Sequence, residues 1–377
     1  PEVFPKSKRI TAGLAPLLGR SVFVTNGAQW ERQRRIIDPA FEGGRLHDTF
    51  PAMVAATHAA IDRIEGETLD VEAWASHAAA DVIFRTLFSI PIEDQLARDT
   101  FNAFRAFQRE QPVATISALL PWLPVVHRRP AREAARRLRR LIGQLVDARQ
   151  NLIEKNEAPD DLATKIMTTR DPETGQSFDR QEMIDQVAIF FLAGHETSAA
   201  LLGWALWLLA AAPEWGDKVA SEAAPFWTEP GVSSLSKLAV TRDVIRETLR
   251  LYPPVPMFVR EAAQDEMFRA RNVRRGSQIV ISPWHLHRHT RHWERPDSFD
   301  PGRWNTATGR ASSRAAYRPF SKGRRVCPGA GFAMAEAAVL LTGVMRRFRF
   351  EICGDPVPVA HLTVRARDGI TLKVFPR

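Results

Sequence analysis

The sequence predicts a mainly α-helical (α+β) fold with a small β region, and three helical stretches carry that prediction. Residues 179–212 form one long apolar helix, roughly 50 Å long at ~1.5 Å per residue. Residues 131–141 form a second helix with a basic face, and residues 243–251 form a third. The chain closes on a strand after Gly369.

The long helix has clear ends and one polar island. Asp179 can cap it with Glu182 three residues on, and Pro213 ends it. The run is apolar nearly all round, so we expect it to be buried. Its island is Ala193-Gly194-His195-Glu196-Thr197-Ser198. Buried polar groups need partners or a function, so the island is either a polar kink or a ligand site.

Composition limits the class of protein. A chain of 377 residues that is 45% apolar can bury a large core, in one domain or two. Two cysteines exclude a disulfide scaffold and indicate a reducing, cytoplasmic compartment. No apolar stretch reaches the roughly 18–20 residues of a membrane span; residues 199–212 come nearest. Because the chain opens at Pro1 rather than Met, we expect a missing N-terminal part. Whether that part carries a membrane anchor is left open.

The net charge of +9 raises the question of a nucleic-acid partner. The basic residues are spread along the chain, with one cluster over residues 128–140. Zinc-ligand spacings, RNA-binding signatures and arginine-rich tails are absent from the sequence. We therefore interpret the cluster as a solvated helix face first, an acidic-protein contact second, and a nucleic-acid site last.

Cys327 is the most informative residue. It follows Lys322, Arg324 and Arg325, whose charges favour a thiolate, and Pro328 suits the first turn of a helix. A thiolate on haem iron favours O–O cleavage. The other cysteine, Cys353, has no such surroundings, and we expect a small buried hydrophobe.

The segment around Cys327 resembles the haem-binding signature of the cytochromes P-450, F-x-x-G-x-R-x-C-x-G. The matching residues are Phe320, Gly323, Arg325, Cys327 and Gly329. The resemblance implies the cytochrome P-450 fold, with haem between the long helix and the cysteine loop and Cys327 as the metal ligand. It also implies that residues 1–377 form a single haem domain without a fused reductase.

The polar island resembles the same family's A/G-G-x-D/E-T-T/S motif. The resemblance implies that Thr197 hydrogen-bonds dioxygen and that Glu196 supplies protons to it, so both are expected to be catalytic. Ala193 and Gly194 would lie over the haem, and Phe190 and Ala193 would touch substrate. Gly194, a mid-helix glycine, predicts the close approach of another body. His195 receives no catalytic role.

Two further segments resemble the family's structural framework. Glu247 and Arg250 match its E-x-x-R motif, and residues 296–304 match P-x-x-F-x-P-x-R-F, with Trp304 in place of the final Phe. By this likeness Glu247, Arg250 and Arg303 form a buried charge triad that holds the cysteine loop.

The haem propionates require cationic or donor partners. Trp30 and Arg34 are four residues apart and resemble the family's W-x-x-x-R. Arg325 and Arg260 occupy positions that the resemblance also assigns to the propionates, and His287 is a weaker candidate. Phe320 and Gly329 complete the expected haem contacts.

We therefore expect a haem-thiolate monooxygenase that hydroxylates or epoxidises a small apolar substrate. An acidic ferredoxin or flavodoxin, with its NAD(P)H reductase, would donate electrons at a surface carrying Lys322, Arg324, Arg32 and Arg35. Val255, Met257, Phe258 and residues 119–124 would line the pocket, although the last group suits an ordinary core equally. The alternatives are a peroxygenase, a haem-thiolate isomerase and a non-catalytic haem sensor.

Overall fold

The computed structural model describes residues 2–42, 44–110 and 127–377. The backbone divides into two compact units. Unit 1 comprises residues 1–42, 86–193 and 258–281, and unit 2 comprises residues 43–85, 194–257 and 282–377. The chain passes from one unit to the other within two continuous helices, α4 (Val71–Phe88) and α9 (Arg180–Ala211).

Unit 1 is built on helices, with two small antiparallel ribbons. Its helices α5 and α7 pack together, and α1 packs on α7. Strand β2 pairs with β5, and β3 with β4. The elements are α1 (Lys8–Leu18), α2 (Gly27–Ile37), η1 (Asp38–Ala40), α5 (Gln95–Arg109), α7 (Arg129–Glu154), α8 (Leu162–Thr168), β2 (Phe258–Glu261), β3 (Glu266–Phe268), β4 (Arg271–Val273) and β5 (Gln278–Ile281).

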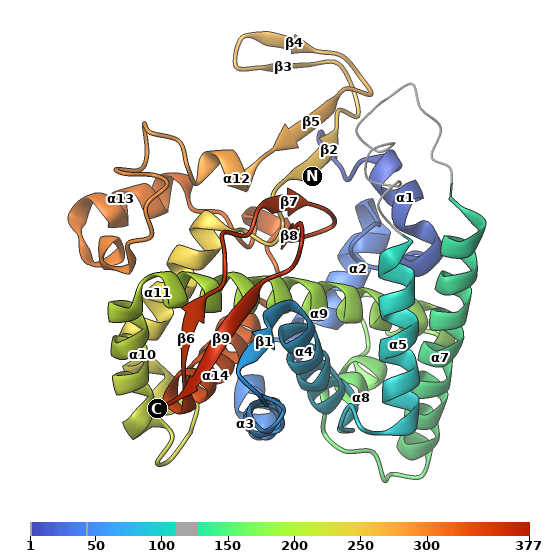
Figure 1. The fold of residues 1–377 in the computed structure, drawn as a ribbon. Helices are drawn as coiled ribbons and strands as arrows, with labels where there is room; N and C mark the ends of the chain where they lie inside the picture. Colours follow the sequence, from blue (N-terminus) through green and yellow to red (C-terminus); the bar gives the residue numbers. More distant parts are fainter. Residues whose placement is uncertain (1, 43, 111–126) are drawn as a thin grey trace. The chain divides into compact units, whose positions relative to one another are not determined.

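Unit 2 contains the larger hydrophobic core, centred on α14. Residues 335–345 of α14 are buried, and the helix packs against α3, α10 and α11 (Figure 1). The helices are α3 (Arg45–Asp62), α10 (Pro213–Phe226), η2 (Ser233–Lys237), α11 (Ala239–Leu251), α12 (Pro283–Leu286), η3 (Pro301–Asn305), α13 (Ala307–Ala316), η4 (Gly323–Arg325) and α14 (Ala330–Arg347).

The strands of unit 2 form one three-stranded sheet and one hairpin. The sheet has the order β1-β9-β6, so the closing strand β9 lies between its neighbours. The hairpin pairs β7 with β8. The strands are β1 (Thr68–Asp70), β6 (Phe348–Ile352), β7 (Pro358–Ala360), β8 (Val364–Ala366) and β9 (Thr371–Pro376). The expected mainly helical fold with a small β region is therefore confirmed.

Helix α9 has the expected ends. The Glu182 N–H donates to Asp179 Oδ1 at 2.7 Å, and the Asp179 N–H donates to Glu182 Oε2 at 3.1 Å, which is a reciprocal capping box. Pro213 begins α10 two residues after α9 ends. One expectation needs correction: by length and composition α9 could cross a membrane, because the apolar run continues on both sides of the polar island. However, 78% of its most apolar window is buried in the protein.

Candidate functional site

The loop that carries Cys327 is a tight backbone structure. Ser321 and Gly323 adopt left-handed conformations, with φ of 65° and 73°, and η4 follows. The Cys327 N–H donates to the Phe320 carbonyl at 3.0 Å, and α14 begins three residues later with Gly329 at its N-cap. The thiol therefore lies just before a helix N-terminus, where positive partial charge favours an anion.

The Cys327 side chain is exposed, as is its neighbour Val326. The expectation for Cys353 was wrong: this cysteine is exposed as well. It follows directly on strand β6, in the bend beyond the sheet, where no core packs over it. The chain thus offers two accessible thiols in different surroundings, and only Cys327 precedes a helix among cationic residues.

The middle of α9 carries one face that the protein does not bury. Between Met183 and Leu206 every residue is buried except Phe190, Ala193, Gly194 and Thr197. These positions are spaced i, i+3, i+4 and i+7, so they share one face of the helix. A helix buried all round except along one short stripe leaves that stripe available to a group other than protein.

Gly194 and His195, in the polar island, both contact α4. A Cβ on Gly194 would lie 2.3 Å from Ile83 Cδ1, so the body that approaches this glycine is the α4 side chain. His195 is buried, and its Nε2 lies 2.7 Å from Ser76 Oγ, also on α4. These contacts give both residues a packing role.

Glu196 is held by the β7–β8 hairpin. Its Oε2 accepts hydrogen bonds from Thr363 Oγ1 at 3.0 Å, Arg365 Nη2 at 2.7 Å and Arg365 Nε at 3.3 Å. Glu196 and Thr363 are buried, and the Arg365 side chain is one quarter exposed. The expected proton donor is therefore engaged in an ion pair, and Arg365 is a site residue that the sequence did not indicate.

A second acid lies beside the island. Ser198 Oγ donates to Glu336 Oε2 at 2.7 Å, and Glu336 Oε1 has no hydrogen-bond partner among the described residues. Burial raises the pKa of Glu336 to about 8, which the Ser198 hydrogen bond opposes. Glu336 is therefore a protonated carboxyl at neutral pH. In the sequence, Glu336 is distinguished only as an acidic residue within the apolar segment of α14.

The structure brings Glu247, Arg250 and Arg303 together. Glu247 Oε1 accepts from Arg250 Nη2 and from Arg303 Nε, each at 2.9 Å, and all three side chains are buried. Arg250 also donates to the carbonyls of His287 and Ser298, so the triad joins α11 to the segment before η3. Trp304 is buried beneath this network with the Arg246 guanidinium 4.2 Å from its ring centre.

His287 acts as a structural acceptor. Its Nε2 accepts from the Arg318 N–H at 2.8 Å, and the residue is fully buried. Burial lowers the pKa of His287 to about 3, so the ring stays neutral and has no charge to offer a propionate. His287 thus anchors the segment before the cysteine loop, and its contact with a propionate stays a prediction.

Unit 1 carries three of the expected anion-binding residues. Trp30 is buried on α2, and Arg34 Nε lies 2.7 Å from Asp38 Oδ1. Arg260 on β2 is half-buried, and burial lowers its pKa. Its guanidinium donates to the Val259 carbonyl at 3.1 Å, and no carboxylate pairs with it in the part of the chain that the structure describes. Such a desolvated cation requires an anion.

The expected basic surface needs correction. Arg32 pairs with Glu182 at 2.6 Å, and Arg35 pairs with Asp171 at 2.5 Å and with Glu173 at 3.0 Å, so acids within unit 1 neutralise both. The Arg35 hydrogen bond holds the pKa of Asp171 well below its usual range. Lys322 and Arg324 are exposed in the cysteine loop.

The expected pocket residues are partly accessible. Val255, Met257 and Phe258 are half-buried among buried neighbours, as expected for side chains that adjoin a ligand. Arg325 and Phe320 are half-buried in the cysteine loop. Residues 119–124 lie outside the described residues.

A family model for cytochrome P450 matches residues 3–374, almost the whole chain. This chain belongs to the cytochrome P450 family. A cytokinin hydroxylase of Arabidopsis thaliana is 31% identical, over 97% of this chain and 73% of that protein. A cyclooctat-9-en-7-ol 5-monooxygenase of Streptomyces melanosporofaciens is 32% identical, over 91% of this chain and 74% of that protein.

A solved structure gives the same fold. The crystal structure of the cytochrome P450DA heme domain matches with a TM-score of 0.85 and 24% identity, and the match covers 99% of this chain and 84% of that chain. The resemblance read from the motifs is thereby confirmed. This cytochrome P450 is a haem-thiolate monooxygenase, and haem is its cofactor.

The residues of this P450 fit a haem. Taken by itself, unit 2 has an exposed thiol just before a helix N-terminus. Taken by itself, unit 1 has a half-buried guanidinium with no carboxylate partner among the described residues. The stripe on α9 is lined by two small residues, an apolar ring and one hydroxyl. An anionic iron ligand, cations for propionates and a mostly apolar surface are the donor set that haem requires.

Proposed function

We propose that this P450 inserts one oxygen atom from O2 into a small apolar organic molecule, by hydroxylation or epoxidation. The observation that carries the substrate class is the stripe on α9, where Phe190 and Ala193 are accessible although most of the middle of the helix is buried. Val255, Met257 and Phe258 add three half-buried apolar side chains. Pockets of this composition bind apolar ligands and orient them with few polar groups.

We propose that the Cys327 thiolate would ligate the haem iron. Trp30, Arg34, Arg260 and Arg325 would hold the propionates, and Phe320, Gly329, Ala193 and Gly194 would adjoin the haem. When bound, haem supplies the activation of oxygen, and the protein supplies ligation, protons and exclusion of water. The Thr197 hydroxyl would hold a proton at Oγ1 on the accessible stripe, and Glu196 would replenish it.

Electrons would come from a separate acidic donor, such as a ferredoxin or flavodoxin served by an NAD(P)H reductase. The support for this proposal is the exposed pair Lys322 and Arg324 beside the ligand loop. Charges of this kind guide an acidic protein into an encounter complex. A soluble, cytoplasmic enzyme is consistent with the interior position of most of α9. We propose residues 1–377 as one haem domain that acts with this separate donor.

The names of the relatives are consistent with this proposal. One is called a hydroxylase of cytokinins and another a monooxygenase of cyclooctat-9-en-7-ol. We infer that this chain likewise oxidises a small organic compound.

A two-part experiment tests the proposal. Apolar candidates are screened for the spectral shift that marks displacement of water from the ferric haem, and binders are then incubated with O2 and a surrogate electron donor. We expect hydroxylated or epoxidised product, and Thr197→Ala should divert electrons to hydrogen peroxide while the resting spectrum stays normal. Product formed only with added peroxide would indicate a peroxygenase, rearranged product an isomerase, and binding without turnover a sensor; each contradicts the proposal.

A further inference from the structure

The ion pair of Glu196 raises a question about proton supply. A carboxylate that hands on a proton must first accept one at an oxygen that is not held by other donors. All three hydrogen bonds from Thr363 and Arg365 reach the same oxygen, Oε2. Glu196 can therefore accept a proton at Oε2 only if the Arg365 guanidinium moves to another carboxylate.

A second carboxylate lies within reach of the same arginine. Glu72, in the first turn of α4, accepts a hydrogen bond at Oε1 from the Ala366 N–H at 3.0 Å, next to Arg365 on β8. Burial raises the pKa of Glu72 above its ordinary value, and the charges of Asp70 and Glu196 add to the rise. The Ala366 hydrogen bond and the charge of Arg365 oppose it.

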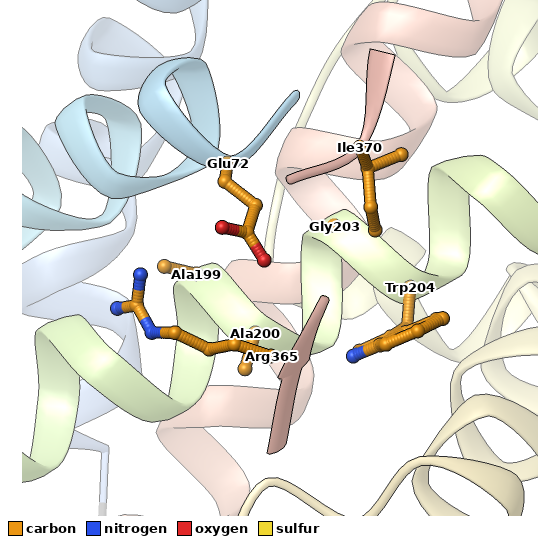
Figure 2. Close-up of a pocket in the computed structure, with 7 residues that line it drawn as sticks. All are labelled: Glu72, Ala199, Ala200, Gly203, Trp204, Arg365 and Ile370. Carbon is orange, nitrogen blue, oxygen red and sulfur yellow. The ribbon is translucent and has the colours of Figure 1, made fainter. Parts of the chain in front are cut away.

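Glu72 and Arg365 line the same recess. It has room for about one water molecule, and residues of α9 line it. Figure 2 shows the Glu72 carboxylate extending from α4 into the space that Arg365 and Trp204 border. The complete lining is Glu72, Ala199, Ala200, Gly203, Trp204, Arg365 and Ile370.

We propose that this recess is the proton entry of the enzyme, with Glu72 as the proton carrier and Arg365 as the positioning residue. A proton from bulk solvent reaches Glu72, relayed by water in the recess. The proton then passes through water to Glu196 while the guanidinium turns from Glu196 to Glu72. Proton and guanidinium exchange places, so the charge in the recess does not change. Arg365 returns once Glu196 has delivered its proton toward Thr197.

The inference rests on the proposed roles of Glu196 and Thr197 and adds two residues from other elements. Its test is Glu72→Gln, which removes the titrating group but keeps an oxygen for the Ala366 N–H. Asp368→Asn is the matched control, because Asp368 is an exposed acid in the turn after β8 and does not line the recess.

In Glu72→Gln we expect coupled product formation to fall by about tenfold, below the 10²–10⁴ typical of a direct acid–base group because water can still enter. The solvent deuterium isotope effect should rise, and peroxide should replace the lost product. Arg365→Lys should retain more activity than Arg365→Met, since it keeps the movable charge. Asp368→Asn should match the wild type.

A readout independent of turnover is the infrared spectrum of the resting enzyme. Two carboxyls, Glu72 and Glu336, should titrate above the ordinary range of glutamate in the wild type, and only that of Glu336 should remain in Glu72→Gln. If Thr197→Ala uncouples the enzyme but Glu72→Gln leaves rate, isotope effect and infrared titration unchanged, the recess is not the proton entry and the proposed function stands. If Thr197→Ala leaves coupling intact, the proposed role of Thr197 fails instead.

Discussion

At the scale of single residues, the strongest electrostatic feature is a carboxyl that the fold keeps neutral. Glu336 is 1% exposed, and a single hydrogen bond from Ser198 does not offset the cost of burying its charge. The hydrogen-bonded pair links α14 to the residue that follows Thr197.

Glu336 gives this P450 a pH-dependent stability. Its pKa is near 4.5 in the unfolded chain and about 8 when folded, so between these values unfolding releases a proton. The free energy of unfolding should therefore fall as pH rises through this window, by up to about 1.4 kcal/mol per pH unit. Glu336→Gln should remove this contribution, which urea unfolding at several pH values measures. Parallel pH profiles for the two proteins would contradict the assignment.

The charge triad is expected to be costly to break. Glu247→Gln leaves Arg250 and Arg303 buried without a carboxylate, which typically costs ~3–5 kcal/mol. The control is Glu351→Gln, because Glu351 pairs with Arg349 at 2.7 Å on the surface, where such pairs contribute about 0–1 kcal/mol. Denaturant unfolding measures both. Equal, small losses would show that the triad is not a buried support of the cysteine loop.

At the scale of elements, α9 combines a functional stripe with a tight contact. Gly194 faces Ile83 of α4, whose Cδ1 occupies the space of a Cβ. The same turn must therefore pack closely on α4 and leave Ala193 and Thr197 accessible. A glycine satisfies both demands despite its low helix propensity.

A double-mutant cycle tests that contact. Gly194→Ala should destabilise the protein by about 1–3 kcal/mol through overpacking, although alanine is the better helix former. Ile83→Val removes Cδ1, so Gly194→Ala in that background should be close to neutral or stabilising. Thermal unfolding of the wild type, the two single variants and the double variant gives the coupling energy between Gly194 and Ile83. Additive effects would mean that Ile83 does not fix the glycine.

Sequence reasoning located the elements better than the partners. Asp179 and Pro213 mark the ends of α9 through local chemistry, capping and the missing proline N–H, which a sequence displays directly. The partner of Glu196 is Arg365, 169 residues away, and no local pattern encodes that contact. Local pattern also misjudged Cys353, because exposure depends on where a strand lies in its sheet.

At the scale of the whole molecule, acidic side chains within the fold neutralise part of the excess positive charge. The chain has a net charge of +9, yet many arginines pair with acids close by. Within the described residues, Lys322 and Arg324 are exposed and belong to the cysteine loop. Docking of an acidic donor should therefore depend on these two residues more than on Arg32 and Arg35.

The exposure of Lys322 and Arg324 leads to a prediction for the rate at which an acidic donor reduces the enzyme. Replacing Lys322 and Arg324 by Gln should slow reduction by an acidic ferredoxin roughly tenfold at low ionic strength and flatten its salt dependence. Arg129→Gln is the control, since its side chain is 89% exposed on α7. Stopped-flow reduction over a range of salt concentrations measures the effect. Rates that are indifferent to salt in the wild type would contradict electrostatic docking.

The account depends most on a sulfur–iron bond at Cys327, and the two accessible cysteines provide an internal comparison. The measurement is the spectrum of the reduced, carbon monoxide-bound protein for the wild type, Cys327→Ser and Cys353→Ser. We predict the red-shifted band of a thiolate-ligated haem in the wild type and in Cys353→Ser, and its loss in Cys327→Ser. A band that survives in Cys327→Ser, or that is missing from haem-loaded wild-type protein, would contradict the account.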